Sequence, residues 1–305
     1  MCCKTTRNCL YLIDDMERLH LPDNIKVHFA GLESKNFITA VSEMGVRYGL
    51  YSAFQFVYKK IFGKGVSEGD FQVMDFLEEK MEHVIQDSGL FSLLYGSKSH
   101  LADEHTVFKW YDALVEWTLE HGKDFSIVEI DCQDILGTDV AWDLRRRLRD
   151  DLPNHRIINV FHLSDGVEGL DRLIEFSDYI GIGSGTPNNS GATMCEVSSY
   201  IKKKKPECDI HMLGCTIPSI LRKCSYCTSS DSIYWKSPLR FGQIGDYHIS
   251  DLDTDKCRSL VGDETWDAIH ERANEISTNA YIAAIEMHKR WYERAAGNQD
   301  YTKRF

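Results

Sequence analysis

The sequence predicts a (β/α)₈ barrel with an added helical segment at its C-terminal end. From residue 25 onward, short apolar segments rich in β-branched residues alternate with longer segments of helical periodicity, and no long polar linker separates them. This alternation indicates parallel strands joined by helical crossovers. Eight such units over roughly 200 residues favour a closed barrel over an open doubly wound sheet.

The strand candidates are eight short apolar segments. They are residues 25–30, 49–53, 83–86, 126–130, 156–161, 179–183, 209–213 and 227–231. Helix candidates between them include residues 105–121, 138–150 and 167–176, in which apolar residues recur at helical spacing.

Three segments are expected along the 305 residues. They are an N-terminal extension (1–24), the barrel (25–250) and a C-terminal helical segment (251–305). Residues 266–291 carry aromatic and aliphatic side chains at helical spacing, which predicts a long helix packed on the barrel.

The composition is that of a globular protein, with 43% hydrophobic and 27% charged residues and a net charge of −12. That charge argues against a protein that coats nucleic acid non-specifically, although an enzyme with a local basic rim remains compatible with it. Candidates for such a rim are Lys59, Lys60 and Lys64, the run 145–147 and the run 202–205. Each of these is also typical of a solvated helix face.

The sequence predicts a cytoplasmic protein. No stretch approaches the ~18 apolar residues of a membrane span, and the N-terminus lacks the apolar run of a secretory signal. Ten cysteines are irregularly spaced, which favours free thiols in a reducing compartment over a disulfide framework.

Polar residues and glycines follow several of the predicted strands. Asp87, Asp131 and Asp231 are carboxylates at three strand ends, His162 follows a fourth, and glycines occupy 181, 183 and 185 at the end of a fifth. Each alone has an ordinary structural explanation: Asp87 precedes Ser-Gly, and Asp231 lies among serines, as turn and capping residues do. Barrel enzymes build their active sites at this end of the strands, so the combination favours a site.

The residue types suggest the chemistry of that site. Two carboxylates in different environments can displace a leaving group at an anomeric carbon, one attacking and the other handling the proton. Glycines let the backbone approach a flat ligand, and Asp131 and His162 can hydrogen-bond a heterocycle's edge. Aromatic candidates for stacking on it are Phe29, Phe91, Tyr179 and Trp235. A flat base with its glycosidic bond between two aspartates is the resulting prediction.

These segments resemble a known family. QDSGLFS (86–92), VEIDCQD (128–134), NVFHLSD (159–165), DYIGIGS (178–184) and HMLGCT (211–216) followed by SSDSIYW (229–235) occur in the order found in the tRNA-guanine transglycosylase superfamily. The set is more similar to the phage and bacterial branch that inserts 7-deazaguanine bases into DNA, and the resemblance covers about residues 25–245.

The resemblance implies a role for each candidate residue. Asp231 would be the nucleophile on C1′ of the sugar, and Asp87 the general acid/base for the departing and incoming bases. The base would be bound by Asp131, His162 and the backbone at Gly181 and Gly183, with Ser88 and Gly89 of the Asp-Ser-Gly motif beside it.

The chain departs from the tRNA enzymes at their zinc site. Those enzymes carry Cys-x-Cys-x-x-Cys and a histidine after the nucleophile, whereas only Cys257 follows Asp231 here. Cys224 and Cys227 precede Asp231 and, with Cys215 or His211, are the candidates for binding zinc. The missing motif favours DNA over tRNA as the substrate.

The resemblance therefore implies a pentosyltransferase that exchanges guanine in DNA for a 7-deazaguanine such as preQ0, in the host cytoplasm if phage-encoded. It would require no redox cofactor or ATP, and the target base would have to leave the stack. A tRNA-guanine transglycosylase, a hydrolase that releases the base, and a non-catalytic barrel that binds nucleic acid are the alternatives.

Overall fold

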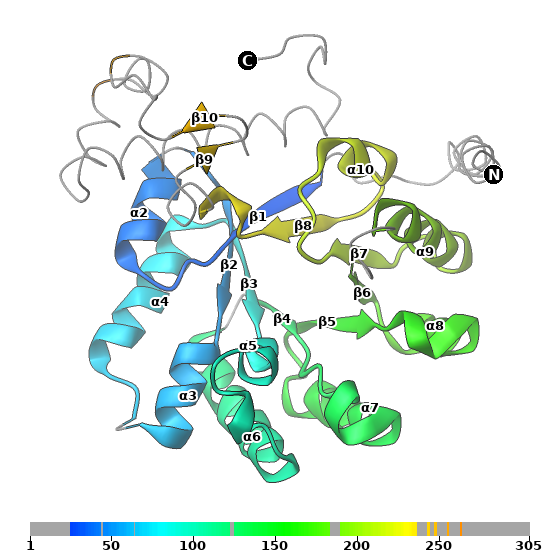
Figure 1. Cartoon of the computed structure of the whole chain (residues 1–305), viewed down its shortest axis with the longest axis horizontal. Helices are drawn as coiled ribbons and strands as arrows, with labels where there is room; N and C mark the ends of the chain where they lie inside the picture. The colour runs from blue at the N-terminus through cyan, green and yellow to red at the C-terminus, as the bar shows by residue number, and fades with distance from the viewer. Residues whose placement is uncertain are drawn as a thin grey trace. The chain divides into compact units, whose positions relative to one another are not determined.

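The computed structural model describes residues 25–236 except 44, 64, 123–124 and 184–189, together with residues 243–244, 247–248, 255 and 263. Eight strands, β1 to β8 in chain order, close into a parallel barrel with helices around it (Figure 1). The predicted fold class is thereby confirmed. The predicted N-terminal extension and the helix at 266–291 lie outside the described residues.

Each of the eight predicted strands corresponds to a strand of the barrel. They are β1 (Lys26–Ala30), β2 (Tyr48–Ser52), β3 (His83–Asp87), β4 (Ser126–Val128), β5 (Arg156–Phe161), β6 (Tyr179–Ile182), β7 (Asp209–Met212) and β8 (Ser229–Ser232). The boundaries of β3 and β8 differ from the prediction at positions that matter for the site. Asp87 is the last residue of β3, and β8 lies further along the chain than 227–231, because its polar Ser-Ser-Asp-Ser sequence gives no hydrophobic signal.

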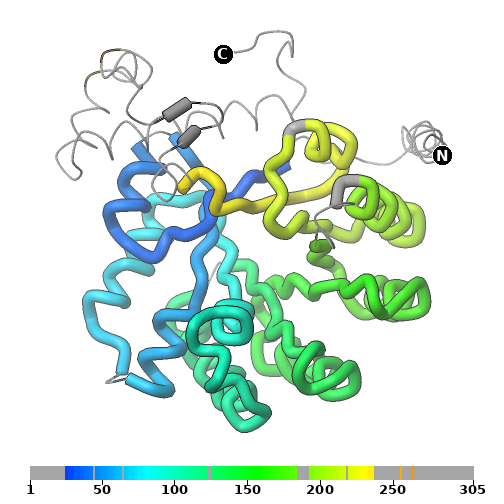
Figure 2. Tube along the Cα trace, in the orientation of Figure 1, coloured from blue at the N-terminus to red at the C-terminus, as the bar shows by residue number. Residues whose placement is uncertain are grey.

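Strands and helices alternate along the chain, whose course Figure 2 traces by colour. They are α2 (Lys35–Glu43), α3 (Phe54–Phe62), α4 (Glu68–Lys80), α5 (Leu90–Tyr95), α6 (Glu104–His121), α7 (Gln133–Asp151), α8 (Gly166–Phe176), α9 (Ser190–Lys204) and α10 (Pro218–Lys223). Short 3₁₀ turns are η2 (Ser99–Leu101), η3 (Leu163–Asp165) and η4 (Tyr234–Lys236), and β9 (Gln243–Ile244) pairs with β10 (Tyr247–His248). The predicted helix 138–150 is the part of α7 that follows a break at Gly137. No helix in the described part of the chain is long and apolar enough to cross a membrane.

Contacts divide the chain into two compact units. Among the described residues, the first unit holds 25–27 and 158–232, and the second holds 28–157 and those from 233 onward.

The core of the second unit is built around aromatic side chains of α6. The predicted apolar face of this helix is buried, and Trp117 stacks on Phe56 with ring centroids 4.6 Å apart. Trp117 Nε1 donates to the Tyr51 hydroxyl at 3.0 Å, and that hydroxyl donates to Gln86 Oε1 at 2.5 Å. Large apolar rings and satisfied buried polar groups thus fix α6 against β2 and β3.

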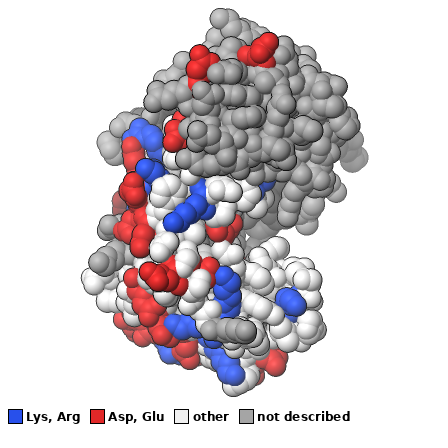
Figure 3. Space-filling model, turned by 90° about the vertical axis from the view of Figure 1, so that its left-hand side faces the viewer, with Lys and Arg blue, Asp and Glu red and all other residues white. Residues whose placement is uncertain are grey.

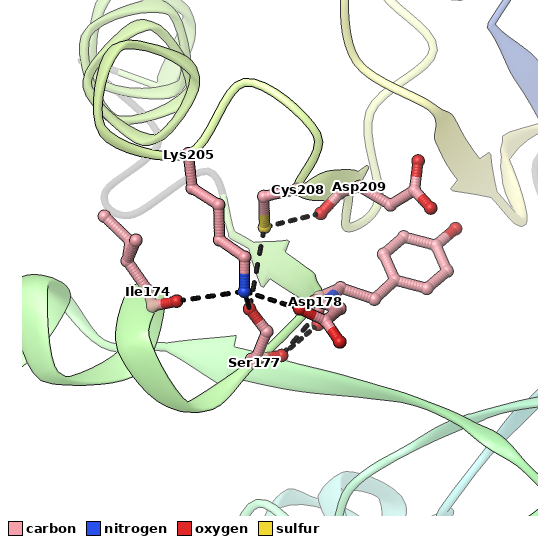
Figure 4. A network of polar contacts seen from close by, with 7 residues as sticks. Ile174, Ser177, Asp178, Lys205, Cys208 and Asp209 are labelled. Carbon is pink, nitrogen blue, oxygen red and sulfur yellow. Dashed lines mark hydrogen bonds and ion pairs between the residues drawn. The ribbon is translucent and has the colours of Figure 1, made fainter.

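In the first unit, the lysine run 202–205 ties α9 to α8. Lys205 Nζ donates to the carbonyls of Ile174 (3.4 Å) and Ser177 (3.1 Å) and pairs with Asp178 at 2.5 Å (Figure 4). The ammonium therefore donates hydrogen bonds to carbonyls at the C-terminal end of α8, where the helix dipole favours a cation. Lys202 is buried and donates to Pro206 O. The run is largely structural, although Lys203 is exposed.

The other described basic candidates also have acidic partners. Lys59 pairs with Asp70 and Lys60 with Glu116, both at 2.7 Å, while Arg147 pairs with Asp112 at 2.9 Å. On the described part of the face shown in Figure 3, basic side chains are interspersed with acidic ones. This pattern is that of solvated helix surfaces, whereas Arg145 is buried.

Gly89→Ala is expected to lower the free energy of unfolding by at least about 1 kcal/mol. Gly89 has φ +74°, and a Cβ there would lie 2.4 Å from the backbone nitrogen of Phe54, which cannot move like a side chain. The measurement is urea unfolding followed by circular dichroism. Gly69→Ala in α4 is the control, because its Cβ would meet only Ser67 Oγ at 3.7 Å. Equal losses in the two variants would contradict this account of Gly89.

Candidate functional site

Asp231 lies within β8 and is held by two hydrogen bonds to one oxygen. Its Oδ1 accepts from the backbone N–H of Gly214 at 2.8 Å and from His211 Nε2 at 3.1 Å. The Asp231 side chain is 13% exposed and that of His211 is 0% exposed. No hydrogen bond reaches Oδ2 from any residue that the structure describes.

Strand register explains why these groups meet. β7 pairs with β8 so that His211 lies opposite Ser229, and side chains two residues apart along a strand share a face. Ser229 and Asp231 therefore lie on the same face as His211. Asp231 is a strand residue whose carboxylate accepts from a backbone N–H of the segment after β7. It is therefore not part of a local turn.

The other predicted residues of the first unit differ in their surroundings. His162 directly follows β5 and is partly exposed. Gly181 is buried, and a Cβ there would lie 3.0 Å from Ile158 Cγ2, so packing alone accounts for this glycine. A Cβ at Gly183 would meet none of the described residues within 4 Å, so their packing does not require this glycine. Residue 185 lies outside the described residues.

In the second unit, Asp87 forms a turn at the end of β3. Its Oδ1 accepts from the backbone N–H of Gly89 at 2.8 Å, which is the local bonding that the turn interpretation predicts. It also accepts from Ser52 Oγ of the neighbouring strand β2 at 3.4 Å. Ser88 is buried, and its carbonyl accepts from Trp110 Nε1 at 2.8 Å. This turn places the Asp87 carboxyl group rigidly at the strand end.

Asp131 lies beyond the end of β4 and is partly buried. Of the four aromatic residues proposed to stack on a base, Phe29, Tyr179 and Trp235 are buried, and Trp235 Nε1 donates to Ala30 O at 2.8 Å. Phe91 is 69% exposed. The first three rings are therefore part of the protein's own packing, whereas Phe91 is exposed and contacts Tyr95, with ring centroids 4.7 Å apart.

Sequence reasoning considered His211 only as a zinc candidate and missed its contact with Asp231. The available signal was alternation: His211 in one predicted strand and Asp231 in the next both precede short loops at the same end. Pairing them requires the register of β7 against β8, which the sequence does not display.

The cysteines near this site are buried thiols. Cys195 Sγ lies 3.2 Å from Cys224 Sγ, and Cys215, Cys224 and Cys227 are buried. Among the residues that the structure describes, no three His, Cys, Asp or Glu side chains are placed to share a metal ion. Zinc bound by Cys215, Cys224 and Cys227 stays a prediction.

The described thiols are expected to react slowly with iodoacetamide in the folded protein. Burial raises the pKa of Cys208 to about 11 and that of Cys132 to about 12, so little thiolate forms at pH 8. Peptide mapping by mass spectrometry measures alkylation at each site, with urea-unfolded protein as the control. The rate in the folded state should rise with pH, since the thiolate is the reactive form. Equal rates in folded and unfolded protein at pH 8 would contradict the described burial.

Comparison with known proteins gives no relative, since no family model and no curated protein matches the chain.

Proposed function

We propose that this chain exchanges guanine in DNA for a 7-deazaguanine base such as preQ0, through a covalent intermediate on Asp231. The observation that carries the proposal is the carboxylate of Asp231. It is fixed through Oδ1 by Gly214 and His211, while Oδ2 takes no hydrogen bond from the described residues. A fixed carboxylate with one open oxygen suits attack on an anomeric carbon.

The first half of the reaction forms an ester. Asp231 Oδ2 attacks C1′ of the target nucleotide, the C1′–N9 bond breaks, and its electron pair goes to guanine. Asp87, in its protonated form, gives guanine a proton. In the second half, Asp87 removes the proton from N9 of the incoming base, which attacks C1′ and releases the carboxylate. Two carboxyl groups suffice for this sequence, with no net change in oxidation state.

Base recognition is assigned in this proposal to Asp131, His162 and the backbone at Gly183. Asp131 and His162 are both partly exposed at strand ends, and no described residue would lie within 4 Å of a Cβ at Gly183, which suits the approach of a flat ligand. Gly181, Ser88 and Gly89 support the site through the packing of β6 and of the β3 turn.

The test is transfer of a radiolabelled 7-deazaguanine base into polynucleotide. Label in DNA, with release of one guanine for each base incorporated, is the expected result. Label in tRNA alone would make the chain a tRNA-guanine transglycosylase. Release of guanine with no incorporation would identify a hydrolase. If guanine is not released and no label is incorporated, the enzymatic proposal is overturned.

Asp131→Ala is expected to weaken binding of guanine and preQ0 by about tenfold or more, because a carboxylate hydrogen-bonded to the base edge is lost. Isothermal titration calorimetry measures the affinity. Asp143→Ala is the matched control, since Asp143 is an exposed carboxylate on α7 paired with Arg146. Wild-type affinity in Asp131→Ala, with the fold intact, would remove Asp131 from the base site.

A further inference from the structure

We propose that His211 is a positioning residue for Asp231, held in the neutral Nε2–H tautomer by Ser229 and Tyr179, and that it selects Oδ2 as the attacking oxygen. This inference rests on the proposed function. It concerns a residue to which neither the sequence analysis nor the family resemblance gives this role.

The proposed tautomer gives each hydrogen-bonding group around the ring a matching role. An ionised carboxylate only accepts, so the 3.1 Å bond from His211 to Asp231 places a proton on Nε2. In the neutral ring the other nitrogen is then an acceptor. Nδ1 lies 2.6 Å from Ser229 Oγ, so the serine hydroxyl donates to it.

Tyr179 completes the chain of donors. Its hydroxyl lies 2.5 Å from Ser229 Oγ, and either oxygen can donate in this pair. In the proposed tautomer the serine proton goes to His211, so Tyr179 is the donor and Ser229 accepts from it. All donors therefore point one way, from Tyr179 through Ser229 and His211 to Asp231. His211, Ser229 and Tyr179 are buried, with exposures of 0%, 1% and 3%. A low-dielectric surrounding strengthens such a chain and penalises an unmatched donor or acceptor.

The two bonds to Oδ1 serve both halves of the reaction. When Oδ2 bonds to C1′, Oδ1 becomes the carbonyl oxygen of the ester and keeps its bonds to His211 and Gly214. When the incoming base breaks the C1′–Oδ2 bond, negative charge returns to the carboxylate. The same two donors stabilise that charge, as donors aimed at a developing anion do.

The experiment compares His211→Leu, which removes the donor, with His211→Gln, whose amide N–H replaces Nε2–H. Adduct formation with DNA is measured in a single turnover without incoming base, and adduct displacement is measured after adding preQ0. We expect His211→Leu to slow both steps by about 10²–10³-fold, with KM for preQ0 within about twofold. His211→Gln should recover at least about tenfold of the rate. A folded His211→Leu protein with wild-type rates overturns the proposal.

The tautomer is measured without reference to activity. In protein labelled with ¹⁵N-histidine, the His211 signals are assigned by their loss in His211→Gln. A protonated Nε2 and an unprotonated Nδ1 at neutral pH support the proposal, and an Nδ1–H tautomer or an imidazolium overturns it. This readout applies even if His211→Leu fails to fold. Should wild-type protein form neither adduct nor exchanged DNA while showing the Nε2–H tautomer, the proposed function fails, and the positioning role fails with it.

Discussion

Asp231→Asn is expected to lower the rate of base exchange by about 10⁴-fold or more and to form no covalent adduct with DNA. The amide keeps the shape of the side chain, and its oxygen can still accept from Gly214 and His211. Its nitrogen, however, carries no charge and no available lone pair with which to attack C1′. Exchange rate is measured by incorporation of labelled preQ0, and the adduct by denaturing gel and peptide mapping.

Asp209→Asn is the matched control for this change. Asp209 is also a strand carboxylate of the same unit, and its Oδ1 accepts from Thr228 Oγ1 at 2.5 Å. It opens β7, at the end of the strand away from the segment that carries Gly214. We expect wild-type exchange from it. Full activity in Asp231→Asn, confirmed by mass spectrometry to have kept its amide, would reduce Asp231 to a structural residue.

Arg145→Met is expected to lower the free energy of unfolding by about 3–5 kcal/mol. Arg145 on α7 donates to both oxygens of Glu129, at 2.7 Å and 2.6 Å, and the two side chains are only 6% and 4% exposed. Removing the guanidinium leaves a buried carboxylate without its counter-charge. Urea unfolding at pH 7 measures the loss.

Two further variants separate charge burial from the loss of an arginine. The double variant Glu129→Leu with Arg145→Met removes both charges and should recover most of the stability. Arg147→Met removes an exposed arginine of the same helix, paired with Asp112 and Asp151, and should cost less than about 1 kcal/mol. A loss below that value for Arg145→Met alone would show that the buried pair contributes little.

The barrel could be predicted because the local spacing of apolar residues indicates most of its strands and helices. The face of α6 that carries Trp110, Leu114 and Trp117 is buried as predicted. β8 was placed too early along the chain because its side chains are hydroxyl groups and a carboxylate. The burial of Ser229 and Ser230 depends on neighbours distant in sequence, and no local pattern reports it.

Candidate residues for the site could be predicted from the sequence, but their contacts could not. Carboxylates at strand ends are visible in the sequence, so Asp87, Asp131 and Asp231 could be selected. The partners of those carboxylates could not, because His211 reaches Asp231 only through the pairing of β7 with β8. The sequence also could not distinguish the two glycines. A Cβ at Gly181 would crowd the side chain of Ile158, whereas a Cβ at Gly183 would meet none of the described residues within 4 Å.

Both the backbone and the carboxylate of Asp231 are held in place. The residue belongs to a strand rather than to a loop, and its carboxylate is tied to a backbone amide and to a buried ring. Such a carboxylate cannot swing towards one base and then the other. During exchange, the migrating part would therefore be the anomeric carbon, with the deoxyribose rocking between two nearly stationary partners. In the proposed mechanism, β8 would hold the nucleophile still while the sugar of the nucleotide moves.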